Sequence, residues 1–191
     1  TGSTVLATGA WTSFIKIDDV PVPVNVKPIR GQMISFHPPQ QMFSKVVFSP
    51  RGYIVPRMDG RVLSGATVED TGFDRSTTED GARQLVMAAT EIAPSLAGLD
   101  IVEHWAGLRP FGVGGLPVLG EMPGYANAFV ATAHFRNGIL LAPVTAKLIC
   151  EKIVDEVSSK YLDIFGVESK ASSKFSVLFV LVPFLFFSFS G

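Results

Sequence analysis

The chain has 191 residues, of which 47% are hydrophobic, and its formal net charge at pH 7 is -1. This length fits one ordinary domain or parts of two, with a substantial core. The 16 basic and 17 acidic residues nearly balance, so the composition predicts no nucleic-acid partner. A single cysteine excludes a disulfide framework and a thiolate zinc cluster, and it favours a reducing, cytoplasmic location.

The first part of the chain predicts short strands separated by turns. Residues 4–7 read as a buried strand, and alternating prolines make residues 20–28 an extended connector. The Asp59-Gly60 pair predicts a hairpin between the two runs around it. The strand-like runs in this part are residues 32–36, 45–48, 53–56 and 62–64.

A helix is predicted over residues 78–92, with Thr77 or Thr78 as its N-cap and Pro94 after its end. Helical spacing directs four apolar residues of this segment to a core, namely Leu85, Ala88, Ala89 and Ile92.

The following segments alternate between strands and a loop. A strand over residues 100–108, a loop over 109–115 and a strand over 128–133 precede a second helix over 139–157. That helix is expected to carry Pro143 near its first turn and to bury Cys150. Its expected apolar stripe consists of Leu141, Val144, Leu148, Ile149 and Ile153.

The end of the chain changes character. Residues 158–174 are polar and Ser-rich, which is typical of a linker, whereas residues 175–189 are apolar and uncharged. The apolar run is shorter than a usual membrane-spanning helix and contains Pro183. Three interpretations stay open for it: a membrane anchor, a docked element, or sequence foreign to the fold.

Familiar catalytic patterns are missing from the sequence. His37, His104 and His134 are far apart and form no metal-binding motif, so no metal site is expected. Arg109 lies at the end of an apolar run, and a carboxylate is the partner that its guanidinium matches best, either a ligand or an internal residue. Arg136 lies directly before a helix start, where negative charge is favoured, although an ordinary strand-to-helix turn explains it as well.

An ordered set of motifs resembles the C-terminal half of the D-amino-acid-oxidase-type family of FAD-dependent oxidoreductases, and within it the glycine oxidases. The similarity covers residues 1–155. The motifs are VLATGAW (5–11), RGQM (30–33), YIVPRMDGRVLSGATVEDTGFD (53–74), HWAGLRP (104–110), GLPVLG (115–120) and HFRNGILLAP (134–143).

This resemblance implies a mixed α+β and α/β fold. An antiparallel-sheet substrate domain over residues 28–114 interrupts a Rossmann-like FAD-binding domain, to which residues 1–27 and 115–157 belong. Residues 158–191 would be a linker and apolar tail. The family's N-terminal half, with its Gly-rich dinucleotide turn, is expected to lie outside this sequence.

The resemblance also implies the residues of the site. Arg109 would grip the substrate carboxylate, with the Tyr53 hydroxyl and Arg136 as further substrate contacts. Residues that would contact FAD form two segments, namely Thr8, Gly9, Ala10 and Trp11, and Arg136, Asn137, Gly138, Ile139, Leu140 and Leu141.

The implied reaction is oxidative deamination of glycine or a similar small amino acid, with a link to thiamine biosynthesis. A hydride passes from Cα to flavin N5, water hydrolyses the imine, and oxygen reoxidises the flavin to give hydrogen peroxide. Two alternatives stay open: a related amine oxidase or dehydrogenase for sarcosine or D-amino acids, or a noncatalytic fragment whose tail associates with a membrane. The sequence also leaves homo-oligomerisation open.

Overall fold

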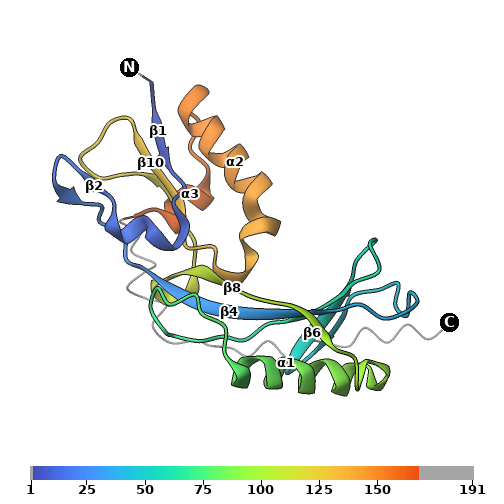
Figure 1. Cartoon of the computed structure of the whole chain (residues 1–191). Helices are drawn as coiled ribbons and strands as arrows, with labels where there is room; N and C mark the ends of the chain where they lie inside the picture. The colour runs from blue at the N-terminus through green and yellow to red at the C-terminus, as the bar shows by residue number, and fades with distance from the viewer. Residues whose placement is uncertain (1, 168–191) are drawn as a thin grey trace.

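The computed structural model describes residues 2–167, which form a five-stranded sheet, a three-stranded sheet and a small two-stranded sheet (Figure 1). No helix in this described part is long and apolar enough to cross a membrane. The apolar run at 175–189 lies outside the described residues, and its three interpretations fall there as well.

The five-stranded sheet is antiparallel throughout, in the order β5-β6-β7-β4-β8. The protein also contains helices and, in the three-stranded sheet, a parallel strand pair. This combination confirms the expected mixed fold class. The predicted hairpin is confirmed, because β6 and β7 pair around a turn in which Gly60 has a φ of +87°. The strands are β4 (Val26–Phe36), β5 (Val47–Ser49), β6 (Gly52–Pro56), β7 (Val62–Gly65) and β8 (Ile101–Gly112).

Strands β4 and β8 are longer than their sequences predicted. The end of the expected connector belongs to β4, and residues 109–112 of the expected loop belong to β8, with Pro28 opposite Pro110. The backbone N–H groups of Arg30 and Gln32 point away from β8, toward Glu69 and Thr67. Because this direction repeats every two residues, Pro28 lies where the ladder with β8 needs no N–H donor, and proline does not interrupt it.

Helix α1 (Glu79–Ile92) covers one face of this sheet (Figure 1). Thr78 is its N-cap, because the hydroxyl of Thr78 accepts a hydrogen bond of 3.1 Å from the backbone N–H of Gly81. The predicted core residues Leu85, Ala88 and Ala89 are buried, and Ile92 packs against the same core while partly exposed. Their partners from the sheet include Ile34, Phe36, Ile54 and Val62.

Substitution of Thr78 by alanine is expected to destabilise the protein by about 1–2 kcal/mol, since the cap and a second hydrogen bond from Gln32 are lost. Chemical denaturation with Thr78→Ala, Thr78→Ser and Thr77→Ala measures this. Thr78→Ser should keep most of the stability, and Thr77→Ala should change it by less than about 0.5 kcal/mol because Thr77 is exposed. Equal losses for both alanine variants would contradict the assignment of the cap.

The three-stranded sheet has the order β1-β10-β9, in which β1 (Thr4–Leu6) runs parallel to β10 (Ala128–Thr132) and β9 (Val118–Glu121) runs antiparallel to it. The strand expected at residues 4–7 is confirmed as β1, but its expected burial is wrong. Thr4 and Val5 are exposed, because β1 is an edge strand of the described sheet and Val5 borders an open cavity. Between β1 and β4 along the chain lie the 3-10 helix η1 (Gly9–Phe14) and the two-stranded sheet of β2 (Lys16–Ile17) and β3 (Val20–Pro21).

Helix α2 (Gly138–Val154) differs from its prediction in three ways. Pro143 is the sixth residue of the helix, so it lies beyond the first turn and leaves the carbonyl of Ile139 without its usual helical donor. Cys150 is exposed, because it faces a cavity. Val144 is 46% exposed, so the apolar stripe is incomplete.

The expected linker contains a short helix, α3 (Lys160–Phe165). Its Leu162 is buried against Leu119 of β9 and Ile149 of α2. Phe165 packs against the same cluster, so a few apolar contacts dock this segment despite its polar composition. The remaining 3-10 helices are η2 (Pro94–Leu96), η3 (Val113–Gly115) and η4 (Phe135–Asn137).

Candidate active site

The face of the five-stranded sheet opposite α1 carries the first group of candidate residues. Side chains alternate along each strand, and Ile34 and Ile54 belong to the α1 face. The alternate residues Met33 and Tyr53 therefore belong to the open face, where both pair with Gly65 of the strand between them. Arg109 of β8, paired with Ile29, lies on this face as well.

The guanidinium of Arg109 is seated on a glycine. A Cβ atom at Gly31 would lie 2.2 Å from both Nη1 and Nη2 of Arg109, so no larger residue fits beneath the side chain. Nη1 of Arg109 also donates a hydrogen bond of 3.0 Å to the carbonyl oxygen of Thr67. These two contacts hold a long, flexible cation in one place on the sheet.

Arg109 has an uncompensated charge. Among residues 2–167 no carboxylate lies within salt-bridge distance of it, although it is partly buried. Burial lowers the pKa of Arg109 from its ordinary value; the nearby Tyr53 raises this pKa and Arg136 lowers it. A desolvated cation without an internal anion is a strong binding position for a ligand carboxylate. Of the two partners that the sequence left open, an internal carboxylate is therefore absent among residues 2–167.

Tyr53 lies beside Arg109 with its hydroxyl end over a second glycine. A Cβ atom at Gly65 would lie 2.8 Å from the Tyr53 hydroxyl oxygen, and the Met33 sulfur lies 4.0 Å from the same oxygen. The ring of Phe48 packs against the Tyr53 ring with centroids 5.4 Å apart. The tyrosine ring is therefore held in an apolar setting, while its hydroxyl has only a weak sulfur acceptor among the described residues.

The start of α2 lies next to the C-terminal end of β8, the end that carries Arg109, on the side of the sheet opposite α1 (Figure 1). The Phe111 and Phe135 rings meet edge to face with centroids 5.1 Å apart, and Phe111 forms an isolated β-bridge with His134. Ala133 and Phe135 have φ values of +63° and +50°, which are unfavourable for residues with side chains. This strained turn carries the chain from β10 into α2 and places Arg136 close enough to lower the pKa of Arg109.

The first turn of α2 lacks a side-chain cap and exposes apolar side chains. Asn137 is the N-cap residue, but its side chain makes no capping hydrogen bond. The side chains of Ile139 and Leu140 are 96% and 79% exposed. Uncapped N–H donors next to a bare apolar surface suit a ligand that has a flat apolar body and an electron-rich polar edge.

A second turn, at Gly9, lies between β1 and η1. The carbonyl of Gly9 accepts hydrogen bonds from Thr12 at 2.8 Å and from Thr132 at 3.2 Å, and the two hydroxyls are 3.0 Å apart. Gly9 has a φ of +57°, and a Cβ atom there would meet nothing within 4 Å. The turn is thus held from below by buried hydroxyls, while the space above Gly9 is open.

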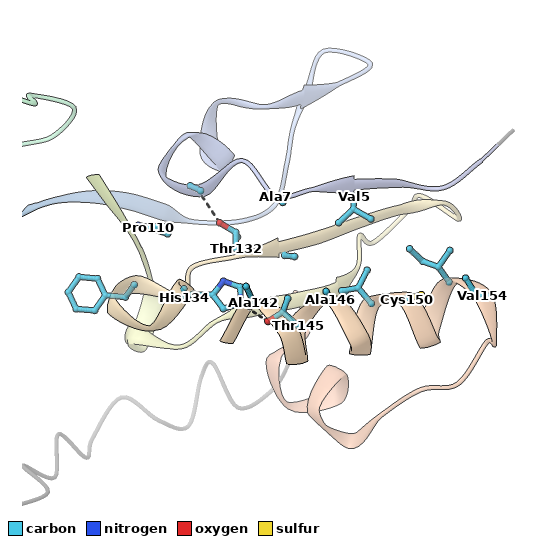
Figure 2. A pocket seen from close by; sticks show the side chains of 16 residues that line it. Val5, Ala7, Pro110, Thr132, His134, Ala142, Thr145, Ala146, Cys150 and Val154 are labelled. Carbon is cyan, nitrogen blue, oxygen red and sulfur yellow. Dashed lines mark hydrogen bonds between the residues drawn. The ribbon is translucent and has the colours of Figure 1, made fainter. Parts of the chain in front are cut away.

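These turns border a cavity of about 680 Å³ between the β1–β10 pair and α2 (Figure 2). Small apolar residues of α2, such as Ala142 and Ala146, face the sheet across it. His134 at its end contacts the Thr145 hydroxyl at 2.9 Å, and burial lowers the pKa of this histidine, which keeps it neutral at pH 7. The volume is typical of ligand sites in proteins.

The expected FAD-contacting segments fit parts of a dinucleotide. Gly9 lets a ligand approach the backbone, and the uncapped turn of α2 offers apolar surface beside N–H donors. Two members fit less directly: Ala10 is 1% exposed, and the ring of Trp11 packs against Phe73 with centroids 5.8 Å apart. They would support the turn at Gly9 from behind.

The structure brings the three expected substrate residues, Arg109, Tyr53 and Arg136, into one neighbourhood, although 83 positions separate the first and last in sequence. Sequence reasoning missed the residues that hold them. Gly31 and Thr67 seat Arg109, and Thr12 and Thr132 hold the turn at Gly9. No local pattern marks these four, because each acts through a partner at least three, and mostly more than thirty, positions away.

The candidate site thus combines a partly buried arginine on an antiparallel sheet with the uncapped start of helix α2. Comparison with known proteins agrees with this arrangement. Residues 1–152 match the family described as "DAO: FAD dependent oxidoreductase". The chain belongs to this family of FAD-dependent oxidoreductases.

The chain is also similar to individual proteins of this family. The chain is 36% identical over 147 residues to a glycine oxidase of Pseudomonas aeruginosa, covering 77% of this chain and 40% of that protein. It is 41% identical over 165 residues to a bifunctional protein ThiO/ThiG of Trichormus variabilis, covering 84% of this chain and 24% of that protein. The crystal structure of glycine oxidase from Geobacillus kaustophilus superimposes with a TM-score of 0.77 at 32% identity, over 86% of this chain and 45% of that one. The chain therefore spans less than half the length of these relatives.

Placing a methyl group under the guanidinium tests the seat of Arg109. Gly31→Ala should push Arg109 aside and weaken the binding of acetate about tenfold, which NMR titration measures. The stability should fall by less than about 1 kcal/mol, because the displaced atoms are the end of a flexible side chain.

Gly107→Ala is the matched control for this substitution. Gly107 is the direct pairing partner of Gly31, but a Cβ atom there would meet nothing within 4 Å. Acetate binding should then stay within about twofold of the wild type, since no contact of Arg109 changes. Unchanged binding in Gly31→Ala would show that Arg109 does not bind the carboxylate.

Proposed function

We propose that this chain supplies the substrate-binding sheet and the C-terminal part of the flavin site of an FAD-dependent oxidase for glycine or a similar small amino acid. The observation that carries the proposal is the partly buried Arg109 beside the start of α2, which pairs with no carboxylate in the described part of the chain. The similarity to glycine oxidases supports the choice of substrate. In this proposal residues 28–114 act as the substrate domain, and residues 1–27 and 115–157 belong to the FAD-binding domain.

Arg109 binds and orients the amino acid in this proposal. Its seat on Gly31 and its bond to Thr67 leave the other guanidinium N–H groups free for the two oxygens of a carboxylate. The Tyr53 hydroxyl adds a third donor, and Arg136 adds positive charge to the same neighbourhood. A carboxylate held at both oxygens leaves the attached Cα with little freedom, which is what a reaction at Cα requires.

The start of α2 and the turn at Gly9 would hold the cofactor. FAD, when bound, supplies the two-electron oxidation of the amino-acid Cα. The N-terminal end of α2 favours negative charge beside it, and Ile139 and Leu140 offer their exposed apolar surface to a flat ring. Gly9 leaves room for a close approach of the dinucleotide to the backbone.

The apolar surroundings of the open sheet face contribute by limiting water. Met33 of β4, Trp105 of β8 and the ring of Tyr53 of β6 lie on the same face of the sheet as the arginine. Removal of water strengthens the attraction between Arg109 and a carboxylate. The similarity to ThiO/ThiG proteins extends the proposal to an oxidation that serves thiamine biosynthesis.

The function is tested with purified protein that contains this chain. Visible absorbance should show bound flavin close to one per chain, and hydrogen peroxide should appear on addition of glycine. Parallel assays with sarcosine and D-alanine rank the competing substrates, and faster turnover of either would shift the proposal to that amine. Colourless protein that releases no peroxide with added FAD would favour the noncatalytic alternative.

The assignment of Arg109 predicts a graded loss of substrate affinity in the active protein. Arg109→Ala removes two charge-assisted hydrogen bonds, worth about 3 kcal/mol together, and should raise KM about 100-fold. Tyr53→Phe removes one bond, worth about 1 kcal/mol, and should raise KM about fivefold. Steady-state kinetics at saturating oxygen measures both, and small, equal effects would remove Arg109 from the substrate site.

A further inference from the structure

The orientation of Arg109 depends on a residue outside the sheet. Its protein hydrogen bond goes to the carbonyl of Thr67, which follows the last residue of β7 by two positions. Thr67 is tied to β4 instead: its N–H donates to the Gln32 carbonyl at 3.3 Å, and its hydroxyl accepts from the Gln32 N–H at 2.8 Å. The position of the Thr67 carbonyl therefore depends on these two hydrogen bonds to Gln32.

A carboxylate completes this arrangement. Glu69 Oε1 accepts a short hydrogen bond from the Thr67 hydroxyl and one of 2.8 Å from the Gln32 side-chain amide. The Thr67 hydroxyl has one proton to donate, and it accepts from the Gln32 N–H at the same time. An acceptor-only group at Glu69 thus fixes the direction of the hydroxyl and the rotamer of Thr67.

Glu69 itself is held from the opposite side. Its Oε2 accepts from Nε of Arg30 at 3.2 Å and from Nη2 of Arg30 at 2.6 Å, and Arg30 is 4% exposed. Backbone bonds between Arg30 and Glu69 in both directions, at 2.8 and 3.0 Å, join the two segments. Burial alone would raise the pKa of Glu69, but the hydrogen bonds from Thr67, Arg30 and Gln32 outweigh it and lower the pKa, so the carboxylate is ionised at neutral pH.

We infer that Glu69 is a positioning residue for substrate binding: through the Thr67 hydroxyl it holds the carbonyl that aims the Arg109 guanidinium at the substrate carboxylate. Glu69 accepts no bond from Arg109 itself, and it lies on the α1 side of β4 with Arg30 and Gln32, away from the open face. The inference rests on the proposed function, because it adds a residue to the same substrate site.

The neighbouring Asp74 provides a matched control. Its Oδ2 accepts from Nη1 of Arg30 at 2.6 Å, so it bonds the same buried arginine as Glu69. Its other bonds go to Ser76, not to Thr67. If the network serves stability alone, loss of the Glu69 carboxylate and loss of the Asp74 carboxylate should change substrate affinity equally. If Glu69 positions Arg109, only the loss of the Glu69 carboxylate should weaken substrate binding.

The experiment compares Glu69→Gln with Asp74→Asn in the flavin-loaded protein that contains this chain. Steady-state kinetics gives KM and kcat for glycine, and NMR titration gives Kd for acetate without any turnover. Glu69→Gln should raise both KM and Kd about tenfold while kcat per bound flavin stays within about twofold, and Asp74→Asn should leave all three within about twofold. A simple loss of folded protein would lower the flavin content instead and leave KM and Kd unchanged.

Thr67→Val keeps the test decisive if Glu69→Gln does not fold. It removes the hydroxyl that joins Thr67 to Glu69, and it should raise KM and Kd by a similar factor. Wild-type constants in Glu69→Gln or Thr67→Val, or equal shifts in Glu69→Gln and Asp74→Asn, would overturn the inference.

The acetate arm separates this inference from the proposed function. Acetate binding that weakens in Arg109→Ala and Glu69→Gln, in a protein that does not oxidise glycine, would support the positioning role and reject the function. Glycine oxidation with wild-type constants in Glu69→Gln would reject the positioning role alone. A wild-type protein that neither binds acetate nor oxidises glycine would reject both.

Discussion

One cation, Arg109, has no counter-ion among residues 2–167, and the candidate site is arranged around it. Arg109 is partly buried on the open face of the five-stranded sheet, and the described residues provide a glycine beneath it and a carbonyl beside it, but no carboxylate. Desolvating a charge in this way costs free energy that a ligand anion can recover. Gly31 beneath the guanidinium and the carbonyl of Thr67 beside it hold this cation in place.

The two faces of the five-stranded sheet differ in what they carry. The α1 face buries a conventional apolar core together with a polar network in which Arg30 and Glu69 neutralise each other. On the open face Arg109 lies beside Tyr53, and no carboxylate of the described residues pairs with it. A charge satisfied within the protein and a charge left for a ligand thus lie on opposite sides of the same two strands, and the two-residue alternation of side chains separates them.

Some parts of the fold followed from local chemistry, and their predictions are confirmed. The helix at residues 79–92 has a capping threonine and an apolar repeat, and the Asp59-Gly60 turn joins two adjacent strands, so all the signals lie within a few residues. Other predictions failed where a distant partner decides. The sequence placed Pro28 in a connector and Pro110 in a loop, but the two lie opposite each other in β4 and β8. It also predicted Cys150 to be buried, but the side of α2 that carries Cys150 faces a cavity.

The sequence by itself determined the mixed fold class, the family resemblance and the identity of the candidate residues, because these depend on residue types in a fixed order along the chain. It could not show how Arg109 is held. Gly31, Thr67 and Glu69 meet Arg109 or each other across gaps of 2 to 78 positions, and their effect depends on which face of a strand each side chain takes. Strand register and the close approach that a missing Cβ permits exist only in the folded protein, and for that reason the tertiary structure alone decided the geometry of the site.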